Sequence, residues 1–136
     1  YINPFLYVIL IISLPLKTPK WFLLFYAFLL GFFVDIFSGS LGFHSTATIL
    51  IAFLKPFISK ITIPHNILGD TDEITLKKIG NKAFITFSFF LILIHNSCLF
   101  IIEYLSFNLA IIGKILASSI ITLIIVLIAQ LFHQKK

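Results

Sequence analysis

Charged side chains are scarce in this sequence, and arginine and methionine are absent from it. Charged residues make up 11% and hydrophobic residues 60% of the 136 residues, whereas a soluble domain usually carries about 25% charged and about 45–50% apolar residues. The mean hydropathy is +1.12. So few polar side chains could not cover a water-soluble core. The composition therefore excludes an ordinary soluble domain and predicts a polytopic membrane protein.

A single cysteine, Cys98, excludes a disulfide within the chain. No serine, histidine and aspartate set, no paired carboxylates and no cluster of metal ligands emerges from the sequence. We therefore expect no catalytic residue, metal or cofactor, and no nucleic-acid partner. Because the sequence begins at Tyr1 rather than at a methionine, we expect a further helix before it.

Long apolar runs dominate the sequence, and we expect each of them to be a helix, because a backbone in lipid must satisfy its own hydrogen bonds. The last two runs are long enough to span a bilayer, the second is at the lower limit, and the first and third are short. The sequence thus predicts one all-α integral membrane domain over residues 1–136, with five helices visible of six in the full protein. The five runs cover residues 4–16, 21–37, 43–57, 83–104 and 109–132.

The lysines fall into groups that alternate with the apolar runs. Two lie between the first and second runs, five surround the connection between the third and fourth, and two end the chain. Alternating helices place these groups on one side, and the positive-inside rule makes that side the cytoplasm. Lys114 is the only lysine expected on the opposite side. The three groups are Lys17 and Lys20; Lys55, Lys60, Lys77, Lys78 and Lys82; and Lys135 and Lys136.

The only substantial polar stretch covers residues 61–82, which we expect to form a cytoplasmic loop. We expect Pro64 to break the helix that precedes it. Asp70 and Glu73 have the spacing of a capping box that would start a short interfacial helix. Ile74, Leu76 and Ile79 would form its apolar face. A solvated loop without a helix remains the alternative.

Four small or acidic residues, Ala27, Gly31, Asp35 and Gly39, recur at intervals of four in the second run. On a helix they share one narrow stripe, and small residues on such a stripe let another helix approach closely. We therefore expect Asp35 on a packing seam between two helices, near the outer surface.

Several groups are candidate partners for the Asp35 carboxylate. Lys114, at similar depth, could form an ion pair with it, and Glu103, at the outer end of the fourth run, is a competing acid. The donors of Ser38, Ser40 and His44 are nearer in the sequence. Alternatively, hydrogen bonds from the beginning of the third helix could cap it, because anions are favoured there. An intramembrane acid can also mark an ion path. We expect His95, with the adjacent asparagine, to form hydrogen bonds between helices.

The order of these motifs resembles the MreD family of bacterial rod-shape-determining membrane proteins. The resemblance rests on the segment YINP, on KTPKW at residues 17–21 and on GFFVDIFSGSLGFHS from residue 31. It also implies that the third helix ends at Lys55-Pro56. Beyond that point the resemblance rests on hydropathy alone. It implies a fold similar to the substrate-binding subunits of energy-coupling-factor vitamin transporters. The residues that carry the motif, and that we expect to pack helices or bind a partner, are Gly31, Asp35, Ser38, Gly39, Leu41, Gly42 and His44.

By this resemblance, the chain would be a non-enzymatic scaffold of the cell-elongation machinery in the bacterial cytoplasmic membrane. Its partners would be an MreC-like protein, a RodA-like glycosyltransferase and the elongation-specific penicillin-binding protein, with the MreB cytoskeleton linked indirectly. These proteins build the lateral peptidoglycan wall. The alternative is a vitamin-binding membrane subunit of an energy-coupling-factor transporter. Its outer cavity would be lined by polar residues such as Asp35, His44, His95, Glu103 and Lys114.

Overall fold

The computed structural model describes residues 7–40, 42–70, 74–105 and 108–134. Every regular element within these ranges is a helix, and four of the helices are long and apolar enough to cross a membrane. They are α2 (Lys20–Ser38), α3 (Phe43–Thr62), α6 (Asn81–Tyr104) and α7 (Leu109–Gln134). Three shorter helices complete the described chain: α1 (Val8–Ile12), α4 (His65–Asp70) and α5 (Leu76–Ile79). The all-helical class and the membrane-embedded character are thus as the sequence predicts.

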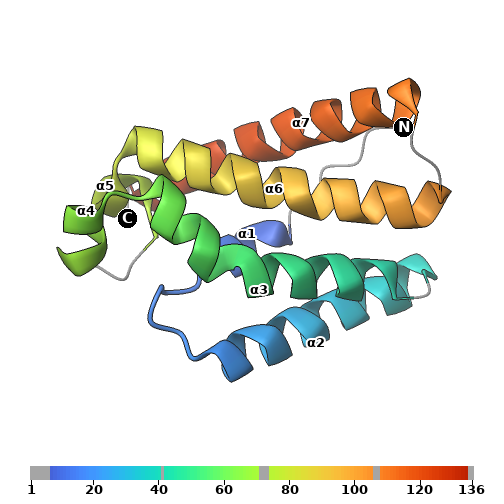
Figure 1. Ribbon diagram of the computed structural model, residues 1–136, viewed down its shortest axis with the longest axis horizontal. Helices are drawn as coiled ribbons and strands as arrows, with labels where there is room; N and C mark the ends of the chain where they lie inside the picture. The colour runs from blue at the N-terminus through green and yellow to red at the C-terminus, as the bar shows by residue number, and fades with distance from the viewer. Residues whose placement is uncertain (1–6, 41, 71–73, 106–107, 135–136) are drawn as a thin grey trace.

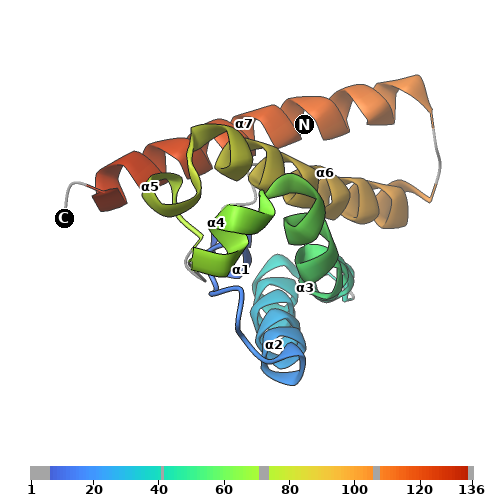
Figure 2. The ribbon, with the colours of Figure 1, turned by 60° about the vertical axis from the view of Figure 1, so that its left-hand side comes forward.

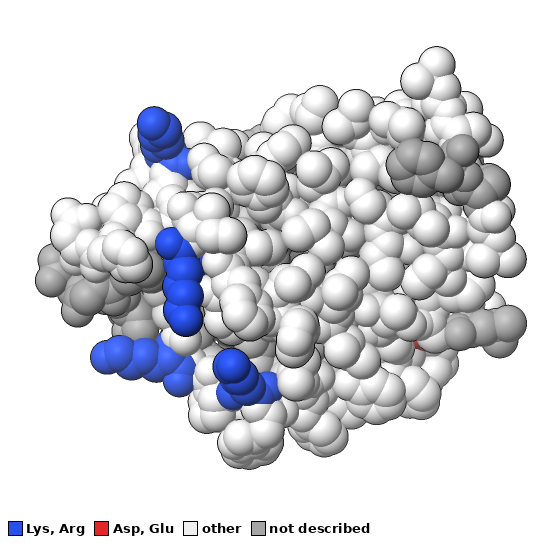
Figure 3. Space-filling model, viewed as in Figure 1, with Lys and Arg blue, Asp and Glu red and all other residues white. Residues whose placement is uncertain are grey.

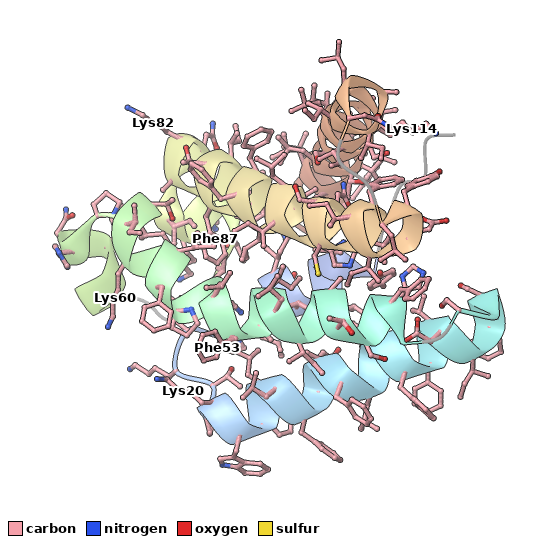
Figure 4. The ribbon with its side chains drawn as sticks, turned by 45° about the vertical axis from the view of Figure 1, so that its right-hand side comes forward. Lys20, Phe53, Lys60, Lys82, Phe87 and Lys114 are labelled. Atoms are coloured by element: carbon pink, nitrogen blue, oxygen red, sulfur yellow. The ribbon has the colours of Figure 1, made fainter. Side chains whose placement is uncertain are left out.

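The four long helices lie side by side in the order α2, α3, α6, α7 (Figure 1). A second view shows α2 and α7 on opposite sides of the α3–α6 pair (Figure 2). Phe87 of α6 fills the space between α6 and α3 (Figure 4) and is fully buried. The core therefore lies around α3 and α6, while α2 packs along α3 and leaves its other faces open.

The first apolar run forms only a short helix in the part that the structure describes. Helix α1 has five residues, far fewer than the roughly 20 that a membrane span needs. It packs against α3 and α6, and Val8, Ile11 and Ile12 are fully buried. Within the described residues, α1 is therefore part of the core rather than a fifth spanning helix.

Helix α3 runs past Pro56, which corrects the expectation that it ends at Lys55-Pro56. Proline removes one helical hydrogen bond, but membrane helices tolerate it where neighbouring groups satisfy the freed carbonyl. The carbonyl freed in this way is that of Ala52, four residues before Pro56, whereas the Ser59 hydroxyl donates to the carbonyl of Pro56 itself, at 2.7 Å. The helix ends at Thr62, just before Pro64.

The polar stretch of residues 61–82 contains α4 and α5 rather than a featureless loop. Thr75, not Asp70, caps α5: its hydroxyl accepts from the Lys78 backbone N–H at 3.1 Å. Asp70 instead ends α4, and Glu73 lies outside the described residues. Ile74, Leu76 and Ile79 are buried, as their spacing suggests.

Exposed lysines gather at one end of the bundle (Figure 3). Lys20, Lys60 and Lys82 lie near that end, where α2 begins, α3 ends and α6 begins, while Lys114 lies toward the other (Figure 4). We call these the lysine-rich end and the turn end. Lys55 departs from the predicted loop group because it is buried within α3.

Candidate functional site

At the turn end, a single carboxylate joins α2 to α3. Asp35 is 4% exposed and accepts four hydrogen bonds. The hydroxyls of Ser40 and Ser45 each donate at 2.6 Å. The backbone N–H groups of His44 and Ser45 donate at 2.9 and 3.0 Å. These N–H groups belong to the first turn of α3, where no helical carbonyl can accept them and where negative charge is favoured. Asp35 therefore caps α3 from the neighbouring helix.

Two glycines in the connection between the helices let the chain reverse tightly enough to form this cap. Gly39 has φ +69° and Gly42 has φ +89°, in the left-handed region that glycine adopts without steric cost. The Ser40 backbone N–H donates to the Asp35 carbonyl at 3.1 Å, which closes the end of α2. Ser38 is the exposed last residue of α2, and Leu41 lies outside the described residues.

Below the cap, α2 and α3 approach closely along the predicted stripe. Ala27, Gly31 and Asp35 are the buried small or polar residues of α2, whereas Gly39, the fourth predicted member of the stripe, lies beyond the end of the helix and is exposed. A Cβ atom added at Gly31 would come within 2.5 Å of the Ser45 Cα atom. The Thr48 hydroxyl donates to the Ala27 carbonyl at 2.8 Å, across the seam. The stripe thus packs two backbones together and holds them with polar contacts.

The other candidate partners of Asp35 lie elsewhere. The Lys114 ammonium is 3.5 Å from the Tyr104 hydroxyl and lies over its ring, 4.9 Å from the centroid. Glu103 is exposed near the end of α6. Among the residues that the structure describes, neither of them contacts Asp35. Of the arrangements predicted for Asp35, the structure therefore contains the hydrogen-bonded cap on α3 and not the ion pair with Lys114.

A second polar cluster crosses the core beside the cap. The Tyr7 hydroxyl lies 2.6 Å from His44 Nδ1 and 2.8 Å from His95 Nε2. His95 Nδ1 lies 3.2 Å from the Asn96 side-chain oxygen, and the Asn96 amide donates to the Ser119 hydroxyl at 3.1 Å. This polar chain therefore connects the beginning of α1 with α3, α6 and α7.

When both imidazoles are neutral, the donors and acceptors of this polar chain can be assigned in one consistent way. The Asn96 oxygen can only accept, so His95 Nδ1 carries a hydrogen and Nε2 accepts from Tyr7. The Tyr7 oxygen then accepts from His44 Nδ1. At the far end, Ser119 donates to the Ile115 carbonyl at 2.7 Å. Each member thus has a partner, which buried polar groups require.

Lys55 holds the other end of α1. Its ammonium donates to the carbonyls of Ile11 at 2.9 Å and Leu14 at 2.5 Å. These carbonyls lie within and just after the last turn of a short helix, where cations are favoured. Lys55 is 2% exposed. Together with Tyr7, it fixes α1 inside the bundle by polar contacts at both ends.

Sequence reasoning identified Asp35, Gly31 and His95 but missed the roles of Tyr7, Lys55 and Ser119. The last three lie far along the sequence from the groups that they contact. Tyrosine, lysine and serine are also common in loops or apolar runs, so the residue types themselves did not indicate these contacts. A lysine flanked by apolar residues on both sides, as in IAFLKPFI, was the one available signal that Lys55 is buried.

Comparison with known proteins adds no assignment: no family model, curated protein or solved structure matches this chain. Within the described residues, no group of three histidine, cysteine, aspartate or glutamate side chains could hold a metal ion. What the site offers chemically is a fully hydrogen-bonded carboxylate and a buried neutral polar chain. Both arrangements fix the positions of helices.

Proposed function

We propose that this chain is a non-enzymatic membrane scaffold of the MreD type, which organises lateral peptidoglycan synthesis in bacterial cell elongation. The observation that carries the proposal is the cap: all four hydrogen bonds to Asp35 come from residues of the α2–α3 hairpin. An acid on a transport path or in a catalytic site must exchange protons or ligands. A carboxylate that is saturated by one hairpin instead stabilises its shape.

The same proposal includes the position of the chain in the cytoplasmic membrane. The lysine-rich end would face the cytoplasm, because cytoplasmic connections carry the excess of lysine. Gathering of Lys20, Lys60 and Lys82 near one end supports this orientation (Figure 4). The fold would be similar to the substrate-binding subunits of energy-coupling-factor transporters.

The open face of α2 is the surface that we propose for a partner. Helix α2 packs against α3 through its small-residue stripe, and aromatic side chains cover its other faces. We propose that the membrane segment of an MreC-like protein lies against this face, and that the RodA-like glycosyltransferase and the elongation-specific penicillin-binding protein join through that contact. The exposed aromatic residues are Trp21, Phe22, Phe25, Phe28, Phe32, Phe33 and Phe37.

Crosslinking in growing cells tests this proposal. A photoreactive residue at Phe32 should capture an MreC-like protein, whereas one at Ile120, an exposed position on α7, should not. Asp35→Leu should reduce capture from Phe32, and Glu103→Leu should leave it unchanged, because Glu103 takes no part in the cap. Equal capture from both positions, or none from Phe32, would reject the partner surface.

The alternative is the vitamin-binding subunit of an energy-coupling-factor transporter. The buried polar chain favours it, since such chains often surround a polar ligand. Against it, the Tyr7 hydroxyl and α1 occupy the space between His44 and His95 that a ligand would need. Equilibrium binding of vitamins to the purified protein separates the two: tight, saturable binding would favour the transporter subunit, and absence of binding the scaffold.

A further inference from the structure

A groove lies at the lysine-rich end, away from the cap and the polar chain. It has a volume of about 560 Å³, within the range of about 300–1,000 Å³ that is typical of small-molecule sites. One wall comes from the end of α3 and from α4, and the other from the end of α5 and the first turns of α6. Its lining residues are Ile61, Thr62, Pro64, Ile67, Ile79, Gly80, Asn81, Lys82, Ala83, Thr86 and Phe90.

Apolar side chains line most of the groove, and one positively charged side chain, that of Lys82, lies along it. Ile61 is 82% exposed and Phe90 is 43% exposed, so the apolar wall continues onto the surface that faces lipid in a membrane-spanning bundle. Lys82 is the only charged residue among the described lining residues. A ligand that fits must therefore combine an apolar body with a negatively charged group.

The beginning of α6 adds hydrogen-bond donors beside Lys82. Gly80, the residue before the helix, supplies no side chain to cap it, and no side-chain cap is present. The first helical bond that reaches back to Gly80 comes from the Phe84 N–H, which leaves the N–H groups of the first turn without helical acceptors. Free N–H groups and the helix dipole attract a phosphate, and Lys82 lies in the same turn.

We propose that this groove binds an anionic phospholipid of the surrounding bilayer. The phosphate would lie at Lys82 and the first turn of α6, and an acyl chain would follow the wall formed by Ile61 and Phe90. If α3 and α6 span the bilayer, the groove lies at the level of the lipid headgroups, because it is lined by the end of α3 and the beginning of α6. Basic pockets between helices at the cytoplasmic surface are the kind of site that holds such headgroups.

Native mass spectrometry of the purified full chain tests the proposal, with phosphatidylglycerol and phosphatidylcholine of the same acyl chains as probes. We expect phosphatidylglycerol to bind preferentially. Lys82→Gln should lower its apparent affinity by about fivefold, while Lys114→Gln, the matched change toward the opposite end, should not alter it. Soluble glycerol phosphate should not displace the lipid, because it lacks the acyl chains.

Asn81→Asp separates lipid binding from stability. Asn81 is exposed and begins α6. A carboxylate there should stabilise the helix and at the same time repel a phosphate. We therefore expect a thermal midpoint that is unchanged or higher, together with weaker binding of phosphatidylglycerol. Equal binding of the two lipids, displacement by glycerol phosphate, equal losses in the two lysine variants, or undiminished binding by Asn81→Asp would each overturn the proposal.

Discussion

The two hairpins of the bundle, α2–α3 and α6–α7, are closed in different ways. In α2–α3, a buried carboxylate and two glycines close the turn, and Gly31 brings the helices into close contact. In α6–α7, a Cβ atom added at Gly113 would meet nothing within 4 Å. There, the side-chain hydrogen bond between Asn96 and Ser119 connects the helices. Of the two glycines, only Gly31 therefore lies where a neighbouring backbone packs closely against its helix.

The largest effect should come from filling the seam of the first hairpin. Gly31→Ala should lower the free energy of unfolding by about 3 kcal/mol, because the Ser45 backbone must move away. Gly113→Ala is the matched control, and it should raise the free energy of unfolding by up to about 1 kcal/mol, since alanine is the better helix former. Reversible unfolding in mixed micelles measures both changes. Similar changes in the free energy of unfolding for the two variants would contradict the claim that only Gly31 lies at a close contact between helices.

Removal of the cap should have the next largest effect. Asp35→Leu should cost about 2 kcal/mol, because the N–H groups of His44 and Ser45 lose their acceptor. Glu103→Leu, which removes an exposed acid from α6, should change the free energy of unfolding by less than about 0.5 kcal/mol. The same unfolding assay measures both. If Glu103→Leu lowered the free energy of unfolding as much as Asp35→Leu, the stability would depend on the loss of any negative charge rather than on the cap.

Breaking the polar contact of the second hairpin should cost less. Asn96→Leu should lower the free energy of unfolding by about 1 kcal/mol, the size of a typical side-chain hydrogen bond between membrane helices. Ser97→Leu changes the neighbouring residue, which lines a lipid-facing groove, and should have little effect. If Asn96→Leu cost more than Asp35→Leu, the polar chain rather than the cap would be the main polar tie of the bundle.

The smallest effect should come from relieving strain in the second turn. Leu105 has φ +49°, the only positive φ among the described non-glycine residues. Leu105→Gly should raise the free energy of unfolding by about 0.5 kcal/mol, because the relief of steric strain slightly exceeds the added entropy of the unfolded chain. Leu105→Asn, which also tolerates this conformation, should show a smaller gain in the same assay. A loss of stability in both variants would show that the leucine side chain itself is needed there.

Much of the fold could be predicted from the sequence, because membrane helices depend on local apolar length. The second to fifth apolar runs correspond to α2, α3, α6 and α7. The stripe containing Gly31 and Asp35 also predicted which face of α2 is buried, because helical periodicity is a local property.

The remainder depends on contacts between distant parts of the chain. The first apolar run was expected to be a membrane helix although it is short, whereas Lys55 and Tyr7 hold α1 within the core through groups on α3 and α6. Lys55 looked like a loop residue because Pro56 suggested a helix end, yet the helix continues to Thr62. Such pairings between distant residues leave little trace in a single sequence, and the apolar residues on both sides of Lys55 were the one signal of its burial.

Amide hydrogen exchange tests the central claim, that Asp35 acts as a cap on α3, most directly. In the wild-type protein, measured by NMR in lipid nanodiscs, the N–H groups of His44 and Ser45 should exchange slowly, because the carboxylate accepts both. In Asp35→Leu they should exchange much faster, while the N–H of Thr46, which donates to the Gly42 carbonyl, should remain protected. Unchanged protection of His44 and Ser45 in Asp35→Leu would contradict the account.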